Sequence, residues 1–375
     1  MRQIKNINIV LEDKVIYGNL TIKDNLILKI EEKGHYKKGK DILIPGFVDI
    51  HIHGGYSYDA MDGGDAVKNL ALNLPKEGTT AFLPTTMTQS YEKVLEALQA
   101  INNYSLNQDE HAARVLGVHL EGPYISPNAA GAQNPTYIRK PNIVEFDKWN
   151  KNAGNIIKKV TVAPELDEDL KFVKHLKKNN IVASIAHTTA NYETTKKAIA
   201  AGLSSFTHTY NAMTKLHHRD IGVVGAALLH TDVLSELIFD KIHTSVEAAK
   251  LLYKNKGAEN IALITDSMRN KGLPDGISEL GGLKVIVKGN EARLEDGSLA
   301  GSILKMIDGY KNLITALDLS LVEASLSSSL TPAKSLKVDD KIGSIKVGKY
   351  ADLLILDKDL NLKETIINGK TVYQK

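Results

Sequence analysis

Short apolar runs alternate with helix-like stretches through the middle of this 375-residue chain. The runs are rich in β-branched residues and have the length of strands, while stretches such as 91–101, 170–179 and 246–254 have helical patterns. Strand–helix alternation repeated about eight times predicts β/α units with parallel strands. The candidate strands are 46–51, 79–85, 115–121, 159–163, 181–187, 204–208, 233–239 and 261–266.

Two α/β architectures have this alternation, an open doubly wound sheet and a closed (β/α)8 TIM barrel. A barrel brings the carboxyl ends of all its strands to one mouth, where its active site lies, whereas an open sheet spreads them along an edge. Five of the runs end in side chains of metal-binding type, which favours the barrel. These side chains are His51 with His53, Glu121, His187, His208 and Asp266.

The two ends of the chain have a different pattern. Residues 1–45 and 334–375 contain short β-like runs separated by turn residues, and Asn368-Gly369 between two apolar runs is a strong hairpin signal. The chain also exceeds the roughly 250 residues typical of one barrel. We therefore predict a metal-dependent barrel domain over 46–333 and a small β-sandwich domain built from 1–45 and 334–375.

Two of the strand ends indicate a metal site by their local pattern. His51 and His53 are two residues apart on a strand, so both imidazoles point the same way and can bind one ion. Glu121 interrupts an apolar run, and a buried carboxylate needs a partner charge, of which a cation is the simplest. His119 shares its face and is either a neighbour of the site or structural. Because the chain has no cysteine, any metal must be held by His, Asp or Glu.

The other three strand ends are ambiguous when each is considered alone. His187 and His208 also fit hydrogen-bonded core histidines, and Asp266 also fits a helix N-cap. Only their common position at strand ends favours a shared site.

Several segments together resemble a known family. The segment PGFVDIHIHG (45–54), the strand-end histidines and the final aspartate look like the amidohydrolase superfamily. The segments HLEGPYISP (119–127), Gly131-Ala132, THTYNAM (207–213) and TDSM (265–268) are similar to N-acetylglucosamine-6-phosphate deacetylases. The resemblance covers nearly the whole chain. It implies metal-dependent hydrolysis of N-acetyl-D-glucosamine 6-phosphate to D-glucosamine 6-phosphate and acetate, in amino-sugar catabolism and recycling.

The resemblance also implies roles for individual residues. Glu121, His187 and His208 would bind the principal divalent metal, zinc or iron, and His51 with His53 match a pair that holds a second ion in some members. Asp266 would be the general base and acid and would contact a metal. His243 would polarise the acetyl carbonyl. The implied substrate contacts are Ala132, Asn211, Ala212, Arg219, His243, Leu299, Ala300, Gly301 and Ser302.

Four positions concern the phosphate. Asn211 and Ala212 match the backbone that approaches the sugar phosphate. Arg219 matches a phosphate-binding arginine that reaches in from the partner subunit of a homodimer, and a guanidinium suits phosphate because it binds two oxygens at once. A surface-loop arginine beside His217 and His218 is the alternative. At position 133 this chain has Gln where some members have His, which leaves that phosphate contact open.

Composition excludes other classes of function. A net charge of +3 is too small for a dedicated nucleic-acid binder. The longest apolar stretch, 221–229, is about half of the roughly 20 residues that span a bilayer, and residues 1–14 lack the apolar core of a signal peptide. We therefore expect a cytoplasmic protein that acts on a small molecule and engages no membrane.

Two other functions fit parts of the pattern. A cyclic-amide hydrolase similar to dihydroorotase commonly bridges two metals with a carbamylated lysine at a strand end, but Lys158 and Lys159 lie at the start of their strand. A catalytically silent metal-binding scaffold would keep the ligands without needing both His243 and Asp266.

Overall fold

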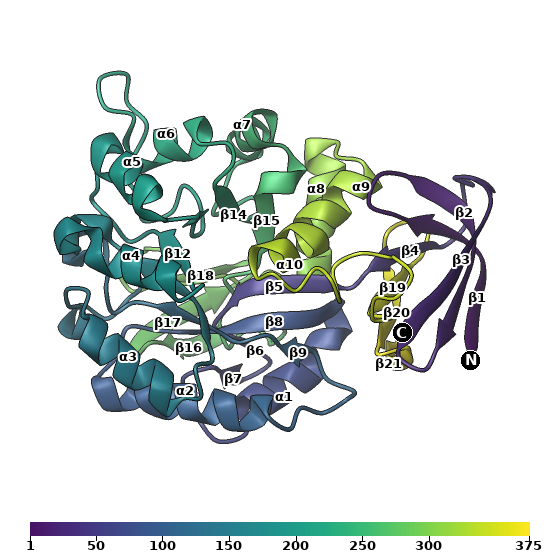
Figure 1. Ribbon diagram of the computed structural model, residues 1–375, viewed down its shortest axis with the longest axis horizontal. Helices are drawn as coiled ribbons and strands as arrows, with labels where there is room; N and C mark the ends of the chain where they lie inside the picture. The colour runs from purple at the N-terminus through teal and green to yellow at the C-terminus, as the bar shows by residue number, and fades with distance from the viewer.

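The computed structural model describes residues 1–375, and its centre is a parallel β-barrel with helices between successive strands (Figure 1). Neighbouring strands pair in chain order around the barrel, so the predicted (β/α)8 fold is confirmed. Each predicted run overlaps one of its strands. They are β5 (Phe47–Ile52), β8 (Thr79–Thr86), β10 (Val118–Glu121), β11 (Ile157–Val162), β12 (Val182–Ile185), β13 (Ser205–Phe206), β14 (Leu234–Ile238) and β15 (Ile261–Ile264).

Ten α-helices cover the barrel and its amino-terminal end. Several begin at a residue whose side chain accepts a hydrogen bond from the backbone three residues on, as Ser90, Asn142, Asn191 and Ser245 do. The helices are α1 (Ala66–Asn73), α2 (Tyr91–Ser105), α3 (Ile143–Asn152), α4 (Lys171–Lys178), α5 (Tyr192–Ala201), α6 (Gly222–Leu229), α7 (Val246–Lys256), α8 (Met306–Leu317), α9 (Leu321–Ser325) and α10 (Thr331–Ser335). None of them combines the length and the apolar character needed to cross a bilayer.

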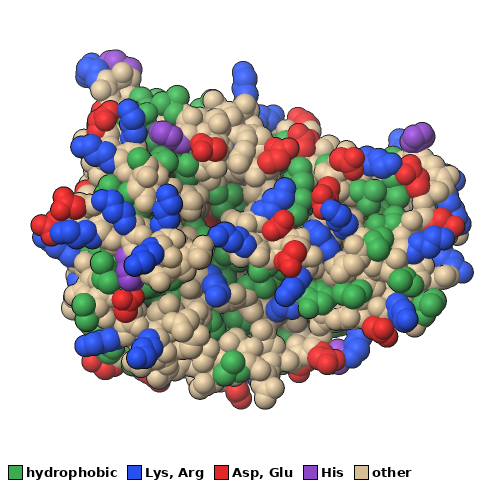
Figure 2. Space-filling view, in the orientation of Figure 1, with side chains coloured by type: hydrophobic (Ala, Val, Ile, Leu, Met, Phe, Trp, Pro, Cys, Tyr) green, Lys and Arg blue, Asp and Glu red, His purple; other side chains and the backbone are tan.

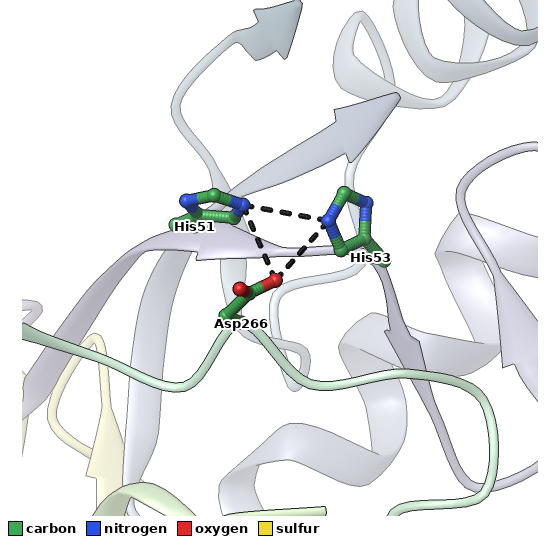
Figure 3. Close-up of side chains that lie close together, drawn as sticks. All are labelled: His51, His53 and Asp266. Atoms are coloured by element: carbon green, nitrogen blue, oxygen red, sulfur yellow. Dashed lines mark hydrogen bonds and ion pairs between the residues drawn. The ribbon is translucent and has the colours of Figure 1, made fainter. Parts of the chain in front are cut away.

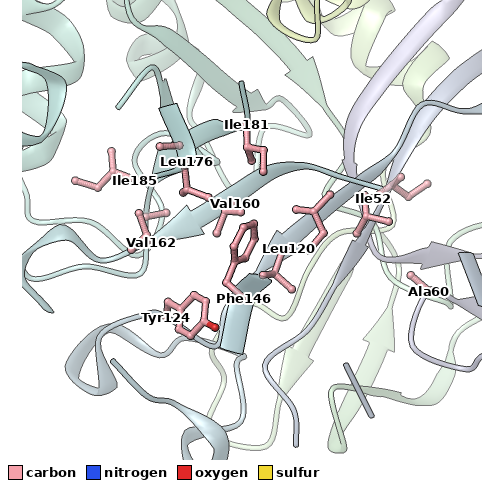
Figure 4. Packing of buried hydrophobic residues seen from close by; sticks show 14 of the residues in the cluster. Ile52, Ala60, Leu120, Tyr124, Phe146, Val160, Val162, Leu176, Ile181 and Ile185 are labelled. Carbon is pink, nitrogen blue, oxygen red and sulfur yellow. The ribbon is translucent and has the colours of Figure 1, made fainter. Parts of the chain in front are cut away.

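The largest core lies between the strands and this helical layer. Leu120 on β10 and Val160 on β11 pack with Phe146 of α3 and Leu176 of α4 (Figure 4). Burying each such side chain contributes about 1.5–3 kcal/mol. Because successive residues on a strand face opposite sides, the polar residues between these apolar ones point into the barrel.

The third barrel strand is interrupted, unlike the continuous run predicted over 115–121. Arg114–Val115 forms a short strand, β9, that pairs with β8, and β10 starts only at Val118. Gly117 between them has a φ of +143°, and a Cβ there would lie 2.8 Å from the carbonyl oxygen of Ile156. The close approach of these two backbones therefore requires glycine.

The first and last strands of the barrel, β5 and β15, do not form a regular ladder. Instead the Thr265 hydroxyl donates to Asp49 Oδ2 at 2.6 Å, and the Asp266 backbone N–H donates to the carbonyl oxygen of His51 at 2.8 Å. These contacts close the barrel at the seam between β5 and β15.

The two chain ends combine in one seven-stranded sheet, which lies beside the barrel and carries both termini (Figure 1). The backbone at the start of the edge strand β3 (Leu26–His35) forms hydrogen bonds with residues 348–351, which precede β19 (Leu353–Leu356). The edge of the sheet therefore curls round to meet the segment before one of its central strands. Twelve buried residues form its own core. In spatial order the strands are β21 (Lys370–Gln374), β20 (Leu362–Ile367), β19 (Leu353–Leu356), β4 (Ile42–Pro45), β1 (Arg2–Val10), β2 (Val15–Lys23) and β3 (Leu26–His35).

Two small β elements were not predicted. A hairpin of β6 (Gly54–Gly55) and β7 (Tyr58–Asp59) follows the first barrel strand. A three-stranded antiparallel sheet of β16 (Gly276–Leu280), β17 (Leu283–Lys288) and β18 (Glu291–Leu294) is inserted between β15 and α8. The inserted sheet packs Leu280 and Val285 onto Met87 and Met268 near the mouth of the barrel.

A buried ion pair fastens the loop after β15. Lys271 Nζ lies 2.7 Å from Glu77 Oε1, and both side chains are 0% exposed. The Tyr56 hydroxyl donates to the other oxygen of Glu77 at 2.9 Å. The pair thus joins the loop that carries Asp266 to the turn before β8.

We expect Lys271→Met to lower the free energy of unfolding by about 3–5 kcal/mol, because it leaves the Glu77 carboxylate buried without its partner charge. The double variant Lys271→Met/Glu77→Leu should be less destabilised than the single variant. Urea denaturation of the three proteins measures this. Equal stability of wild type and Lys271→Met would contradict a structural role for the pair.

Candidate functional site

One group of ligand-type side chains forms at the seam between β5 and β15 (Figure 3). His51 Nε2 and His53 Nε2 are 3.4 Å apart. Asp266 Oδ1 lies 3.4 Å from the first and 3.2 Å from the second. The His-x-His pair therefore points the same way, as predicted, and meets the aspartate that follows the last strand.

A second group lies directly beside the first. Glu121 Oε1 is 3.0 Å from His208 Nε2 and 3.4 Å from His187 Nε2, and the two imidazole nitrogens are 3.1 Å apart. The other oxygen, Glu121 Oε2, is 3.1 Å from His53 Nε2. Glu121 therefore stands between the two groups, and the structure brings all six predicted ligands together.

Three of these residues share an unusual backbone conformation. His187, His208 and Asp266 each lie two residues beyond the end of a strand and have φ values of +47°, +32° and +49°. The left-handed region costs a non-glycine residue about 1–3 kcal/mol, and such strain is found at functional sites. Here it turns the chain at the strand end, so that the side chain crosses the barrel mouth. No helix starts at Asp266, so the N-cap interpretation is wrong.

Hydrogen bonds determine which imidazole nitrogens carry a lone pair. His53 Nδ1 donates to the Thr85 carbonyl oxygen at 3.1 Å, and His187 Nδ1 donates to that of Ala129 at 2.9 Å. Their Nε2 atoms face other ring nitrogens and carboxylate oxygens. Burial opposes a charge on His53, but the carboxylates of Asp266 and Glu121 raise its pKa well above the usual value. These Nε2 atoms can converge only with a cation between them, either a proton or a metal ion, so the donor set fits a divalent metal.

The same surroundings keep the carboxylates ionised. Burial alone would raise the pKa of Asp266, but the imidazoles of His51 and His53 hold this pKa down at about 2. Burial opposes ionisation of Glu121 as well, and the imidazoles of His51, His187 and His208 hold its pKa well below its usual range. Both carboxylates are therefore available as metal ligands or proton acceptors at neutral pH.

A cavity of about 150 Å³ opens above the ligands. His243 lines it, and its Nδ1 donates to Asp240 Oδ2 at 2.6 Å, which leaves Nε2 for the cavity. Burial raises the pKa of Asp240, but the bond to His243 holds it below its usual range. The predicted substrate residues that line the cavity are Ala132, Asn211, Ala212, His243, Leu299 and Gly301.

Three predicted substrate residues lie outside the lining. Ala300 is buried in the core of the inserted sheet. Ser302 Oγ donates to the Thr265 carbonyl and its backbone N–H to that of Asp266, so it supports the loop that carries the aspartate. Arg219 is exposed on the loop between β13 and α6, where its Nη1 contacts His218 Nε2. A loop in this part of the chain projects beside α5 and α6 in Figure 1.

Several site residues had no role assigned from the sequence. Gln133 Nε2 donates to Glu121 Oε2 at 2.8 Å and thereby orients that carboxylate. Asp240 holds His243, while Glu236 and Lys159 form a buried pair inside the barrel. A charged residue within an apolar strand is the signal that indicated Glu121, and it applies equally to Glu236.

Comparison with known proteins agrees with this geometry. The model of the Amidohydrolase family matches residues 42–372. N-acetylglucosamine-6-phosphate deacetylase of Bacillus subtilis (strain 168) is 42% identical, over 99% of this chain and 96% of that protein.

Solved structures have the same fold. N-acetylglucosamine-6-phosphate deacetylase from Thermotoga maritima is 39% identical with a TM-score of 0.92, and 100% of each chain is covered. A variant of the N-acetyl-D-glucosamine-6-phosphate deacetylase from Mycobacterium smegmatis, in complex with N-acetyl-D-glucosamine 6-phosphate, is 26% identical with a TM-score of 0.93 and 99% of each chain covered. The resemblance found in the sequence motifs is confirmed, and the chain belongs to the amidohydrolase family.

Proposed function

We propose that this protein hydrolyses the acetamide of N-acetyl-D-glucosamine 6-phosphate to D-glucosamine 6-phosphate and acetate. The observation that carries the proposal is the position of Asp266. Its carboxylate contacts His51 and His53 and lines the same cavity as His243. A proton acceptor and a hydrogen-bond donor thus face one space beside five further side chains of metal-binding type, and the named relatives support the choice of substrate.

The chain's own residues divide the chemistry between them. When bound, a divalent metal supplies a water whose pKa is lowered to about 7. Asp266 accepts the proton of the attacking water and returns it to the departing amine, which leaves poorly as an anion. His243 donates from Nε2 to the acetyl carbonyl oxygen and stabilises the charge that develops there. The bond from Nδ1 to Asp240 Oδ2 orients the ring for this donation.

We infer that Glu121, His187 and His208 hold the principal ion and that His51, His53 and Asp266 form a second site. The ligands are all nitrogen and oxygen, a set that suits zinc or iron.

The cyclic-amide alternative fits the site less well. Lys159 lies in the middle of β11 and its ammonium pairs with Glu236, while the carboxylate between the two ligand groups comes from Glu121. A carbamylated lysine would therefore have no role to fill here. Acetate release from N-acetyl-D-glucosamine 6-phosphate, compared with hydrolysis of dihydroorotate by the same metal-loaded protein, tests the proposal. Preferred hydrolysis of dihydroorotate would overturn it.

The phosphate end of the substrate lacks a cation in the isolated chain. Asn211 and Ala212 line the cavity, but Arg219 lies outside it in the exposed run 215–220 before α6. A loop projects beside α5 and α6 in Figure 1, and Figure 2, in the same orientation, shows basic and histidine side chains at its tip. We infer that the protein is a homodimer in which Arg219 of each subunit binds the phosphate at the partner's site. An exposed projecting loop suits such an exchange.

Removal of metal should abolish activity, and Glu121→Gln should lower metal content, because the amide replaces a charged ligand. Elemental analysis and an acetate-release assay on the same preparation measure both. His175→Ala is the matched control, since His175 also faces a carboxylate, Asp147, but lies on α4 away from the site. Full activity in protein free of metal would refute the metal-dependent mechanism.

Asp266→Asn should lower kcat by at least about 10², because a positioned acid–base group is worth about 10²–10⁴ in rate. The variant should keep its fold and its principal ion. Steady-state kinetics, metal content and melting temperature on one preparation distinguish lost catalysis from lost structure. Turnover near the wild-type rate would remove Asp266 from the mechanism.

Arg219→Ala should mainly raise KM for the phosphorylated sugar, since a lost charged hydrogen bond costs about 1.5–3 kcal/mol. N-acetylglucosamine without phosphate should be little affected, and Lys215→Ala on the same exposed loop serves as control. Mixed dimers of Arg219→Ala and Asp266→Asn chains should recover activity, because one of their two sites has both residues intact. No recovery in verified mixed dimers would show that Arg219 does not act across the interface.

A further inference from the structure

A buried charged pair inside the barrel has no part in the steps described above. Lys159 on β11 pairs through its Nζ with Glu236 Oε1 on β14, and the two side chains are 1% and 0% exposed. In the sheet order β12 and β13 separate the two strands, so the pair spans the interior of the barrel. A buried pair of this kind is often no more stabilising than apolar side chains of similar volume. We therefore expect the pair to have a role other than stabilising the fold.

The oxygen of Glu236 that does not pair with Lys159 contacts two of the candidate ligand residues. Glu236 Oε2 lies 3.2 Å from His51 Nδ1 and 3.3 Å from the backbone nitrogen of His208. A carboxylate accepts, so His51 donates from Nδ1, and Nε2 is the ring atom that faces His53 and Asp266. One oxygen thus holds a residue of each ligand group.

We propose that Glu236, held in place by Lys159, is a positioning residue that sets the affinity of the group His51, His53 and Asp266 for a divalent cation. It does so by fixing the tautomer and ring orientation of His51. The inference rests on the proposed metal-dependent function, but it concerns metal affinity rather than turnover. Loss of such a partner behind a metal-binding histidine typically weakens metal binding about 10–100-fold.

Two double variants separate the effect of losing the hydrogen-bond acceptor for His51 from the effect of losing the buried charges. Lys159→Met/Glu236→Leu replaces the pair with apolar side chains and removes the acceptor for His51. Lys159→Met/Glu236→Gln also removes both charges but keeps an amide oxygen that can accept from His51 and His208. The two proteins therefore differ in the hydrogen bond and not in buried charge.

The measurement is zinc binding to metal-free protein, by competition with a chromogenic chelator, together with the melting temperature of the metal-free form. We expect the Leu variant to melt near the wild type and to bind one of its two zinc ions about 10–100-fold more weakly. The Gln variant should recover most of that affinity. Equal zinc binding by the folded Leu variant and the wild type would overturn the proposal, as would a Gln variant no better than the Leu variant.

A control and a direct observation complete the test. Arg114→Met/Asp352→Leu removes another pair with a buried carboxylate, which joins β9 to the segment before β19 and has no hydrogen bond to a ligand, and its zinc affinity should stay at the wild-type value. An equal loss in this control would overturn the proposal. Ring ¹⁵N spectra of metal-free wild type should show His51 protonated at Nδ1, a result that needs no variant to fold; a His51 ring protonated at Nε2 and not at Nδ1 would contradict the proposal. Wild-type protein that binds no zinc would refute the metal-dependent function itself.

Discussion

The site depends on the contact between the first and last strands of the barrel. β5 and β15 lack a regular ladder, and the bond from the Asp266 backbone to the His51 carbonyl, with the Thr265–Asp49 contact beside it, holds them together. This contact brings ligands that are more than two hundred positions apart in the chain to within hydrogen-bonding distance. A barrel that opened at this seam would separate Asp266 from His51, and the first ligand group would be lost.

The second constraint on the site is the burial of several carboxylates inside the barrel. The interior of the barrel contains the carboxylates of Glu121, Glu236 and Asp266, and burial lowers the pKa of Lys159, the lysine that pairs with Glu236, well below its usual value. Ionised groups are costly to bury unless they are paired. A bound divalent cation would reduce this imbalance, and any ligand that binds only the folded state raises its stability. Metal binding and the stability of the barrel should therefore be coupled.

The positions of the side chains come from a rigid barrel and strained strand ends. Left-handed residues at His187, His208 and Asp266 direct their side chains across the mouth before a substrate or ion arrives. The unfavourable backbone conformation is maintained because the surrounding core and hydrogen bonds leave no alternative. Gln133 and Asp240 extend this arrangement, since each holds one functional side chain from behind.

The sequence alone determined the barrel, the sheet made from both chain ends and the six candidate ligands that the structure groups together, because residue periodicity and strand-end position are local patterns. It did not indicate the inserted sheet of β16–β18, whose short strands lie among turn residues outside the β/α repeat. The pairing of Glu236 with His51 and Lys159 was equally hidden, since these residues are 185 and 77 positions apart. Which side chain stands behind which ligand is decided only when the barrel closes, because its curvature brings together strands that are distant in the chain.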